Sequence, residues 1–169
     1  VIEAYKLFKF DRKKYKILIH PQSYVHSIVR LKNGLVKMIL YNNDMKIPIF
    51  NTLYKNKNYT LNTKKIDNKI LNKLSFQNVD LKKYPSIKLI EKCFKSGFST
   101  PIIINASNEV LVNLYLKGKI GFLDIVRTLN KIFKDKEFKK YAKRNTRSVK
   151  DIITTDSWAR LKTTSMCVR

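Results

Sequence analysis

The sequence has 169 residues, enough for one ordinary domain or two small ones, and its 44% apolar share is typical of a globular protein with a buried core. No apolar run approaches the roughly 18 residues of a membrane span, and charges interrupt any early run that could serve as a signal peptide. The net charge of +24 permits nucleic-acid binding, but lysines are spread along the whole chain, which favours compositional drift over a phosphate-binding face. Because the first residue is valine, we expect a piece of a longer protein.

The two cysteines, Cys93 and Cys167, lack the close spacing of a metal site. Two distant cysteines fit a reducing compartment and ordinary packing.

The first third of the chain predicts the end of a helix, then three strands. Residues 1–8 are expected to be helical, and the apolar run 15–19 predicts a short buried strand. The runs 24–31 and 35–41 flank Asn33-Gly34, a pair that strongly favours a β-hairpin.

A two-residue turn at Asn33-Gly34 predicts that Ile28 pairs with Ile39 and His26 with Tyr41. Because side chains alternate between the faces of a strand, one face should then be almost wholly apolar. That face comprises Val25, Ser27, Val29, Leu31, Val36, Met38 and Leu40. His26 is expected on the opposite, mixed face at the end remote from the turn, open to a ligand or to another domain.

The next helix is predicted to begin at Met45 with Asp44 as its cap. Residues 54–84 are polar and weakly periodic, which indicates a connecting segment with short ordered pieces around residues 70–76. The last half predicts a four-helix bundle. Its expected helices cover residues 85–96, 100–117 and about 122–133, and a last one follows a capping box of Ser148 and Asp151.

The residues alone leave the site open. His20 is interpreted as shaping a turn, whereas a functional role and a structural one are equally compatible with His26. Ser23 could bond a ligand or satisfy the backbone, and Met45 could cover a flat ring or belong to the core. The polar stripe on the helix 100–117 favours a buried network that holds helices together. It consists of Asn105, Asn108, Glu109 and Asn113.

Three motifs resemble the 1-deoxy-D-xylulose 5-phosphate reductoisomerase family, in unbroken order over about residues 1–133. They are His20-Pro21-Gln22-Ser23 with His26-Ser27, Asp44-Met45 with Pro48-Ile49, and Asn105-Ala106-Ser107-Asn108-Glu109. The resemblance implies an α+β fold: the rear half of an α/β catalytic domain with an antiparallel hairpin, then a small all-α C-terminal domain. It implies a rear catalytic part over residues 1–56, a connecting segment over 57–84 and a helical domain over 85–169.

By this resemblance, the complete enzyme rearranges its sugar phosphate substrate with a divalent cation, Mn or Mg, and reduces the product with NADPH. His26 is then the catalytic histidine and also binds substrate. Ser23 lies in the same pocket, and Met45 contacts both substrate and nicotinamide. A homodimer without membrane or nucleic-acid partners is implied, in the cytoplasm of a bacterium or in a plastid-type organelle.

The chain also departs from the family. The NADPH-binding domain, the acidic metal-binding motif and the flap over the substrate are missing, and Glu3 neighbours the position of a metal ligand without being one. Asn43 replaces a usual proline, and Tyr54-Lys55 replaces Trp-Pro. We therefore expect no metal ligand in this chain and no turnover by it alone. The alternatives are an inactive remnant that forms an oligomer interface, or a basic nucleic-acid binder.

Overall fold

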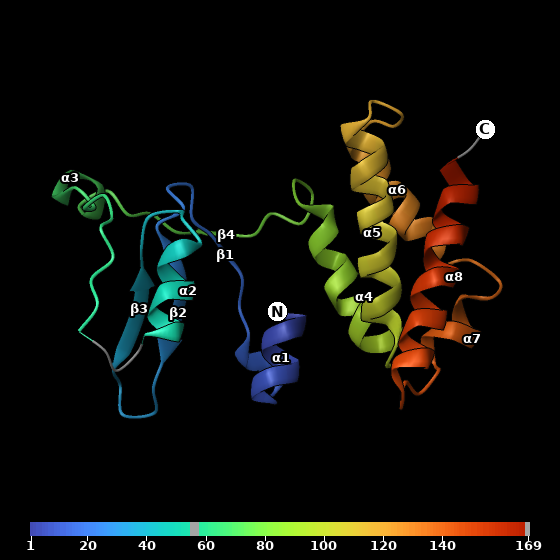
Figure 1. The fold of residues 1–169 in the computed structure, drawn as a ribbon, viewed down its shortest axis with the longest axis horizontal. Coiled ribbons are helices and arrows are strands. Elements are labelled where there is room, and N and C mark those ends of the chain that lie inside the picture. Colours follow the sequence, from blue (N-terminus) through green and yellow to red (C-terminus); the bar gives the residue numbers. More distant parts are fainter. Residues whose placement is uncertain (55–57, 168–169) are drawn as a thin grey trace. The chain divides into compact units, whose positions relative to one another are not determined.

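The computed structural model describes residues 1–54 and 58–167 (Figure 1). The chain divides into two compact units, one of Val1–Tyr15 with Asp80–Arg169 and the other of Lys16–Val79. The domain boundaries expected after residues 56 and 84 concern a longer protein, so they remain a prediction.

The first unit is helical and contains the predicted bundle. Its elements are α1 (Ile2–Phe8), the 3-10 turns η1 (Arg12–Lys14) and η2 (Pro85–Ile87), α4 (Lys88–Ser96), α5 (Thr100–Leu116), α6 (Phe122–Ile132), α7 (Phe138–Ala142) and α8 (Val149–Cys167). The four expected helices correspond to α4, α5, α6 and α8, and α7 is a short addition that no sequence signal indicated.

The caps explain where these helices begin and end. Ser148 and Asp151 form the predicted capping box: the Asp151 N–H donates to Ser148 Oγ at 3.2 Å, and the Ser148 N–H donates to Asp151 Oδ2 at 3.2 Å. Gly97 ends α4 with φ 133°, a conformation that L side chains rarely adopt.

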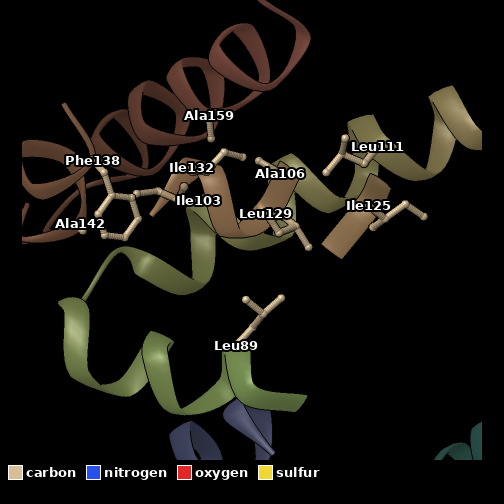
Figure 2. Close-up of a cluster of buried hydrophobic side chains, with 10 residues drawn as sticks. All are labelled: Leu89, Ile103, Ala106, Leu111, Ile125, Leu129, Ile132, Phe138, Ala142 and Ala159. Carbon is tan, nitrogen blue, oxygen red and sulfur yellow. The ribbon is translucent and has the colours of Figure 1, made fainter. Parts of the chain in front are cut away.

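Within residues 1–54 and 58–167, all buried core side chains belong to this helical unit. α5 packs along α8, and α6 contacts both helices (Figure 1). The cluster drawn in Figure 2 consists of Leu89, Ile103, Ala106, Leu111, Ile125, Leu129, Ile132, Phe138, Ala142 and Ala159. Ile125, Leu129 and Ile132 form the core side of α6, with the spacing that one face of a helix requires.

The second unit holds two small antiparallel sheets and two short helices. Its elements are β1 (Leu18–Ile19) paired with β4 (Gln77–Asn78), β2 (Val25–Arg30) paired with β3 (Val36–Leu40), α2 (Lys46–Leu53) and α3 (Asn68–Leu71). The buried strand expected over residues 15–19 is wrong in length and burial, because β1 has two residues and Leu18 is 44% exposed. The ordered pieces expected around residues 70–76 are α3 and β4, and residues 55–57 of that segment lie outside the described part.

The hairpin exists as predicted, but its register is shifted by one residue. The Leu31 N–H donates to the Leu35 carbonyl at 2.8 Å and the Gly34 N–H donates to the Leu31 carbonyl at 3.2 Å, so the loop has three residues rather than two. Gly34 has φ 87°, as a three-residue loop with a left-handed last position requires. Ile28 therefore pairs with Met38 instead of Ile39.

The shift changes which side chains share a face. Apolar side chains now occur on both faces, and the almost wholly apolar face expected from the sequence is wrong. Ile28, Val36 and Met38 share one face, whereas Val29, Leu35 and Ile39 share the other. All six are exposed, between 37% and 57%.

Among the described residues, no helix has the length and hydropathy needed to cross a lipid bilayer.

Candidate functional site

The His20-Pro21-Gln22 segment fastens the start of the hairpin to the segment before β4. His20 donates from Nδ1 to the Ser75 carbonyl at 2.8 Å, and its ring stacks on Phe76 at 4.9 Å between centroids. Gln22 Nε2 donates to the Lys73 carbonyl and to Ser75 Oγ, both at 2.9 Å. The interpretation of His20 as a residue that shapes local structure is confirmed by these contacts.

Ser23 directly follows the His20-Pro21-Gln22 segment and adopts an unusual backbone conformation. Its φ is 56°, in the left-handed region, and its N–H donates to the His20 carbonyl at 3.1 Å. A non-glycine residue there is strained, and such strain often occurs at functional sites. Ser23 lines a cavity of about 450 Å³. The other lining residues are Gln22, Tyr24, Asn42, Asn43, Asp44, Ile47, Asn62, Thr63 and Lys64.

His26 lies at the β-bulge that interrupts β2. Val25 pairs with Leu40 and Ser27 with Ile39, which leaves His26 without a partner in the ladder. The alternation of strand faces therefore does not determine its direction, contrary to the sequence-based placement on the mixed face. Its ring stacks on Tyr41, with centroids 3.8 Å apart and planes at 14°, and Nε2 lies 3.2 Å from the Tyr41 carbonyl oxygen. The predicted cross-strand pairing of His26 with Tyr41 is therefore wrong, although their side chains are in contact.

Met45 stands at the start of α2 and is 66% exposed. The helix begins one residue later than predicted, at Lys46, so Met45 and not Asp44 occupies the cap position. Asp44 Oδ1 nevertheless accepts from the Lys46 N–H at 2.9 Å. Its exposure excludes Met45 from the core of this chain and leaves its thioether available to a partner surface.

The loop of residues 41–45 connects the candidate residues. Tyr41 contacts His26, Asn42 to Asp44 line the cavity with Ser23, and Met45 follows. The Asn42 side-chain amide also donates to the Lys64 carbonyl, which brings the segment 62–64 to the cavity wall. No sequence motif points to Asn42 or Lys64, whereas the predicted pairing with His26 already drew attention to Tyr41.

The polar stripe of α5 is exposed, so its prediction as a buried network is wrong. It nevertheless joins helices: Glu109 Oε2 accepts from Arg160 of α8 at 2.6 Å, and Asn105 donates to Glu109 Oε1 at 3.1 Å. Hydrogen bonds from Arg160 to Asp156 and then Glu109 raise the pKa of the Arg160 guanidinium. These contacts are structural, and we assign them no chemistry.

The described residues contain no group of three or more His, Cys, Asp or Glu that could hold a metal ion. Burial raises the pKa of the Cys93 thiol to about 11, which keeps it protonated near neutral pH and unsuited to nucleophilic chemistry. Groups at the cavity and its loop that are capable of proton transfer or hydrogen bonding include the Ser23 hydroxyl, the His26 imidazole and the Asp44 carboxylate.

Comparison with known proteins places this geometry in a family. The profile described as the DXP reductoisomerase C-terminal domain matches residues 40–162. The 1-deoxy-D-xylulose 5-phosphate reductoisomerase of Pelagibacter ubique is 39% identical over 99% of this chain and 43% of its own length. The corresponding protein of Zymomonas mobilis is 32% identical over 98% of this chain and 42% of its own length.

Solved structures agree with this relationship. The Zymomonas mobilis reductoisomerase in complex with NADPH superposes with a TM-score of 0.85 over 99% of this chain and 43% of that chain. A reductoisomerase in complex with NADPH, fosmidomycin and magnesium gives a TM-score of 0.90 at 28% identity, over 98% of this chain and 42% of that one. The chain thus spans about two fifths of the length of these relatives. By the profile match over residues 40–162, it belongs to the DXP reductoisomerase C-terminal domain family.

Proposed function

We propose that this chain supplies the rear wall of the substrate pocket and the helical domain of a 1-deoxy-D-xylulose 5-phosphate reductoisomerase. That enzyme makes 2-C-methyl-D-erythritol 4-phosphate by rearranging the carbon skeleton and reducing the product with NADPH. The observation that carries the proposal is the loop 41–45, which holds His26 through Tyr41 and lines the cavity shared by Ser23 and Asp44.

Each proposed role uses chemistry that the structure leaves available. The exposed His26 imidazole exchanges a hydrogen bond with a substrate hydroxyl and is the proposed catalytic residue. The Ser23 hydroxyl binds substrate oxygen in the cavity. Met45, with 66% of its surface exposed, packs against the substrate and the nicotinamide ring.

The cofactors fit this chain only in part. A divalent cation, Mn or Mg, supplies charge stabilisation to the substrate oxygens in the complete enzyme, but the described residues offer no set of metal ligands. We therefore propose that residues outside this chain hold the cation and most of NADPH. The 169-residue chain alone should then show no turnover.

Activity of a fused protein tests the proposal. The remaining part of the Pelagibacter ubique relative would be joined ahead of Val1, and substrate-dependent loss of NADPH absorbance would be followed. We expect turnover from the fusion, and a loss of kcat of about 10² to 10⁴ on His26→Gln, the range typical for removal of a general acid or base. Lys37→Gln, an exposed change on β3, serves as the control. An active fusion in which His26→Gln retains parental kcat would refute the assigned role.

We also propose that the hairpin contributes to a homodimer. Val36 and Ile39 are 54% and 52% exposed on opposite faces of the hairpin, and apolar side chains left in water favour association. In the fusion, we expect Lys at one of these positions to raise the dimer dissociation constant at least about tenfold, measured by analytical ultracentrifugation. The matched control is Leu161→Lys on α8, which is also an exposed apolar residue, at 74%. Unchanged dissociation in both hairpin variants would contradict the assignment.

We propose that the basic charge reflects composition and not nucleic-acid binding. We also propose that the compartment is a bacterial cytoplasm, as the bacterial relatives suggest, or a plastid-type organelle if the source is eukaryotic. A salt titration of binding to duplex DNA tests the first point, because a steep dependence on salt would show real phosphate contacts.

A further inference from the structure

We infer that Tyr41 is a positioning residue for His26 and that it makes Nδ1 the imidazole nitrogen offered to the substrate. The inference rests on the proposed function in one respect, namely that His26 meets the substrate. The contacts that support it, between His26 and Tyr41, lie within this chain and do not depend on the function.

The hydrogen bond of His26 determines which of its nitrogens carries the proton. Nε2 lies 3.2 Å from the Tyr41 carbonyl oxygen, and a carbonyl oxygen only accepts hydrogen bonds. Nε2 must therefore carry the hydrogen. A neutral imidazole has one N–H, so the lone pair is on Nδ1. No described residue hydrogen-bonds Nδ1, which leaves it free to accept from a hydroxyl.

The Tyr41 ring holds the imidazole in this orientation. The two rings are nearly parallel, with planes at 14° and centroids 3.8 Å apart. Contact between two aromatic rings stabilises their relative orientation in addition to the effect of the area that they bury. The contact covers one face of the imidazole and leaves its edge, where the nitrogens lie, accessible.

The bulge explains why such a support is needed. His26 is the unpaired residue between Val25 and Ser27, so no cross-strand neighbour fixes its side chain. Elsewhere in the hairpin, a cross-strand neighbour restrains each side chain. For His26, Tyr41 provides that restraint. One residue supplies both restraints, the ring through its face and the carbonyl through Nε2.

Nitrogen-15 NMR of the histidine rings in the full 169-residue chain, at a pH where both are neutral, tests the inference. The sequence has only His20 and His26, so His26→Gln assigns the signals. We expect His26 to show a single tautomer with hydrogen on Nε2, and ring protons shifted upfield by the Tyr41 ring current. Tyr41→Phe should preserve both signatures. Tyr41→Leu keeps the carbonyl acceptor but removes the ring that holds the imidazole against it, so it should abolish the ring-current shift and increase the share of the Nδ1–H tautomer.

His20 provides the fold control within the same unit. It stacks on Phe76, so its own shifts report whether Tyr41→Leu has unfolded the surroundings. If that variant unfolds, the shifts and tautomers of His26 in the parent chain are compared with those of the histidine in a short Val-His-Ser peptide. A parent His26 with peptide-like shifts and tautomers would overturn the inference. The NMR result needs no turnover, so failure of the activity test on the fusion would sink the proposed function and leave the tautomer assignment standing.

Discussion

Gly97 is a residue at which the helical unit should tolerate no side chain. A Cβ built there would lie 2.3 Å from the Ala142 carbonyl oxygen, and φ is 133°. The backbone would have to move, because the three nearest atoms belong to the backbone of Ala142 and Lys143 and not to a flexible side chain. We expect Gly97→Ala to lower the free energy of unfolding by about 3 kcal/mol or more, measured by urea denaturation.

Gly118→Ala is the matched control, since this glycine also has positive φ, at 68°, but nothing lies within 4 Å of its Cβ. This substitution should lower the free energy of unfolding only by the cost of holding alanine in the left-handed conformation, about 1–2 kcal/mol. Equal losses in the two variants would show that the approach of Ala142 does not matter.

At the level of single residues, the sequence predicted local features but not the contacts between distant segments. The sequence predicted that a helix ends at residue 96, directly before Gly97, which local propensity is enough to indicate. It did not indicate the contact with Ala142, because that contact joins residues far apart in the chain. His26 was placed near Tyr41, but the ring stack and the bulge depend on a register that local pattern does not determine.

Among the connections between helical segments, the ion pair of Asp135 with Lys162 joins the end of α6 to α8. The Asp135 side chain is 10% exposed, and Lys162 Nζ lies 2.8 Å from its Oδ2. Burial alone would raise the pKa of Asp135, but hydrogen bonds from Lys162 and from the Glu137 N–H outweigh it, and the pKa is lowered. A carboxyl whose pKa is lowered by folding stabilises the fold above its ordinary value of about 3.9. That stability is lost as the pH falls through the folded value.

We therefore expect Asp135→Asn to destabilise the protein by about 1 kcal/mol at neutral pH and to flatten the dependence of stability on pH below about 4. Asparagine keeps the oxygen that accepts from the Glu137 N–H, so the change removes only the charge and the acceptor that faces Lys162 Nζ. Urea denaturation at several pH values measures both effects. Glu91→Gln is the control, because its pair with Lys95 is 80% and 72% exposed and should contribute little. An unaltered acid slope in Asp135→Asn would contradict the assignment.

The elements differ in how well the sequence predicted them. Helix ends at Ser148 and Gly97 carry their own chemical signals, and those predictions are confirmed. The hairpin was also predicted, but Asn33-Gly34 fits a loop of two or of three residues. Choosing the wrong loop moved every cross-strand pair by one position, because strand side chains alternate with a period of two.

At the scale of the whole molecule, the two units differ in burial. Every buried core residue, from Leu89 to Ala159, belongs to the helical unit. No described residue of Lys16–Val79 is buried, and the hairpin exposes Val29, Leu35 and Ile39. The sequence predicted the helical bundle, whose signals are local and periodic. It overestimated the core of the hairpin unit, because apolar strands indicate burial without saying which part of a longer protein provides it.

This contrast predicts the distribution of stability along the chain. A two-stranded hairpin without a buried face is marginal in water, so its amides should open locally while the α5–α8 core stays closed. Hydrogen exchange followed by mass spectrometry should show protection in β2 and β3 at least about a hundredfold lower than in α5, equivalent to about 2.7 kcal/mol. Fusion to the remaining part of the Pelagibacter ubique relative should raise protection in the hairpin and leave that of α5 unchanged, because α5 already packs in a buried core whereas the hairpin has none. Equal protection of both units in the isolated chain would mean that the exposed strands are stable without a partner surface.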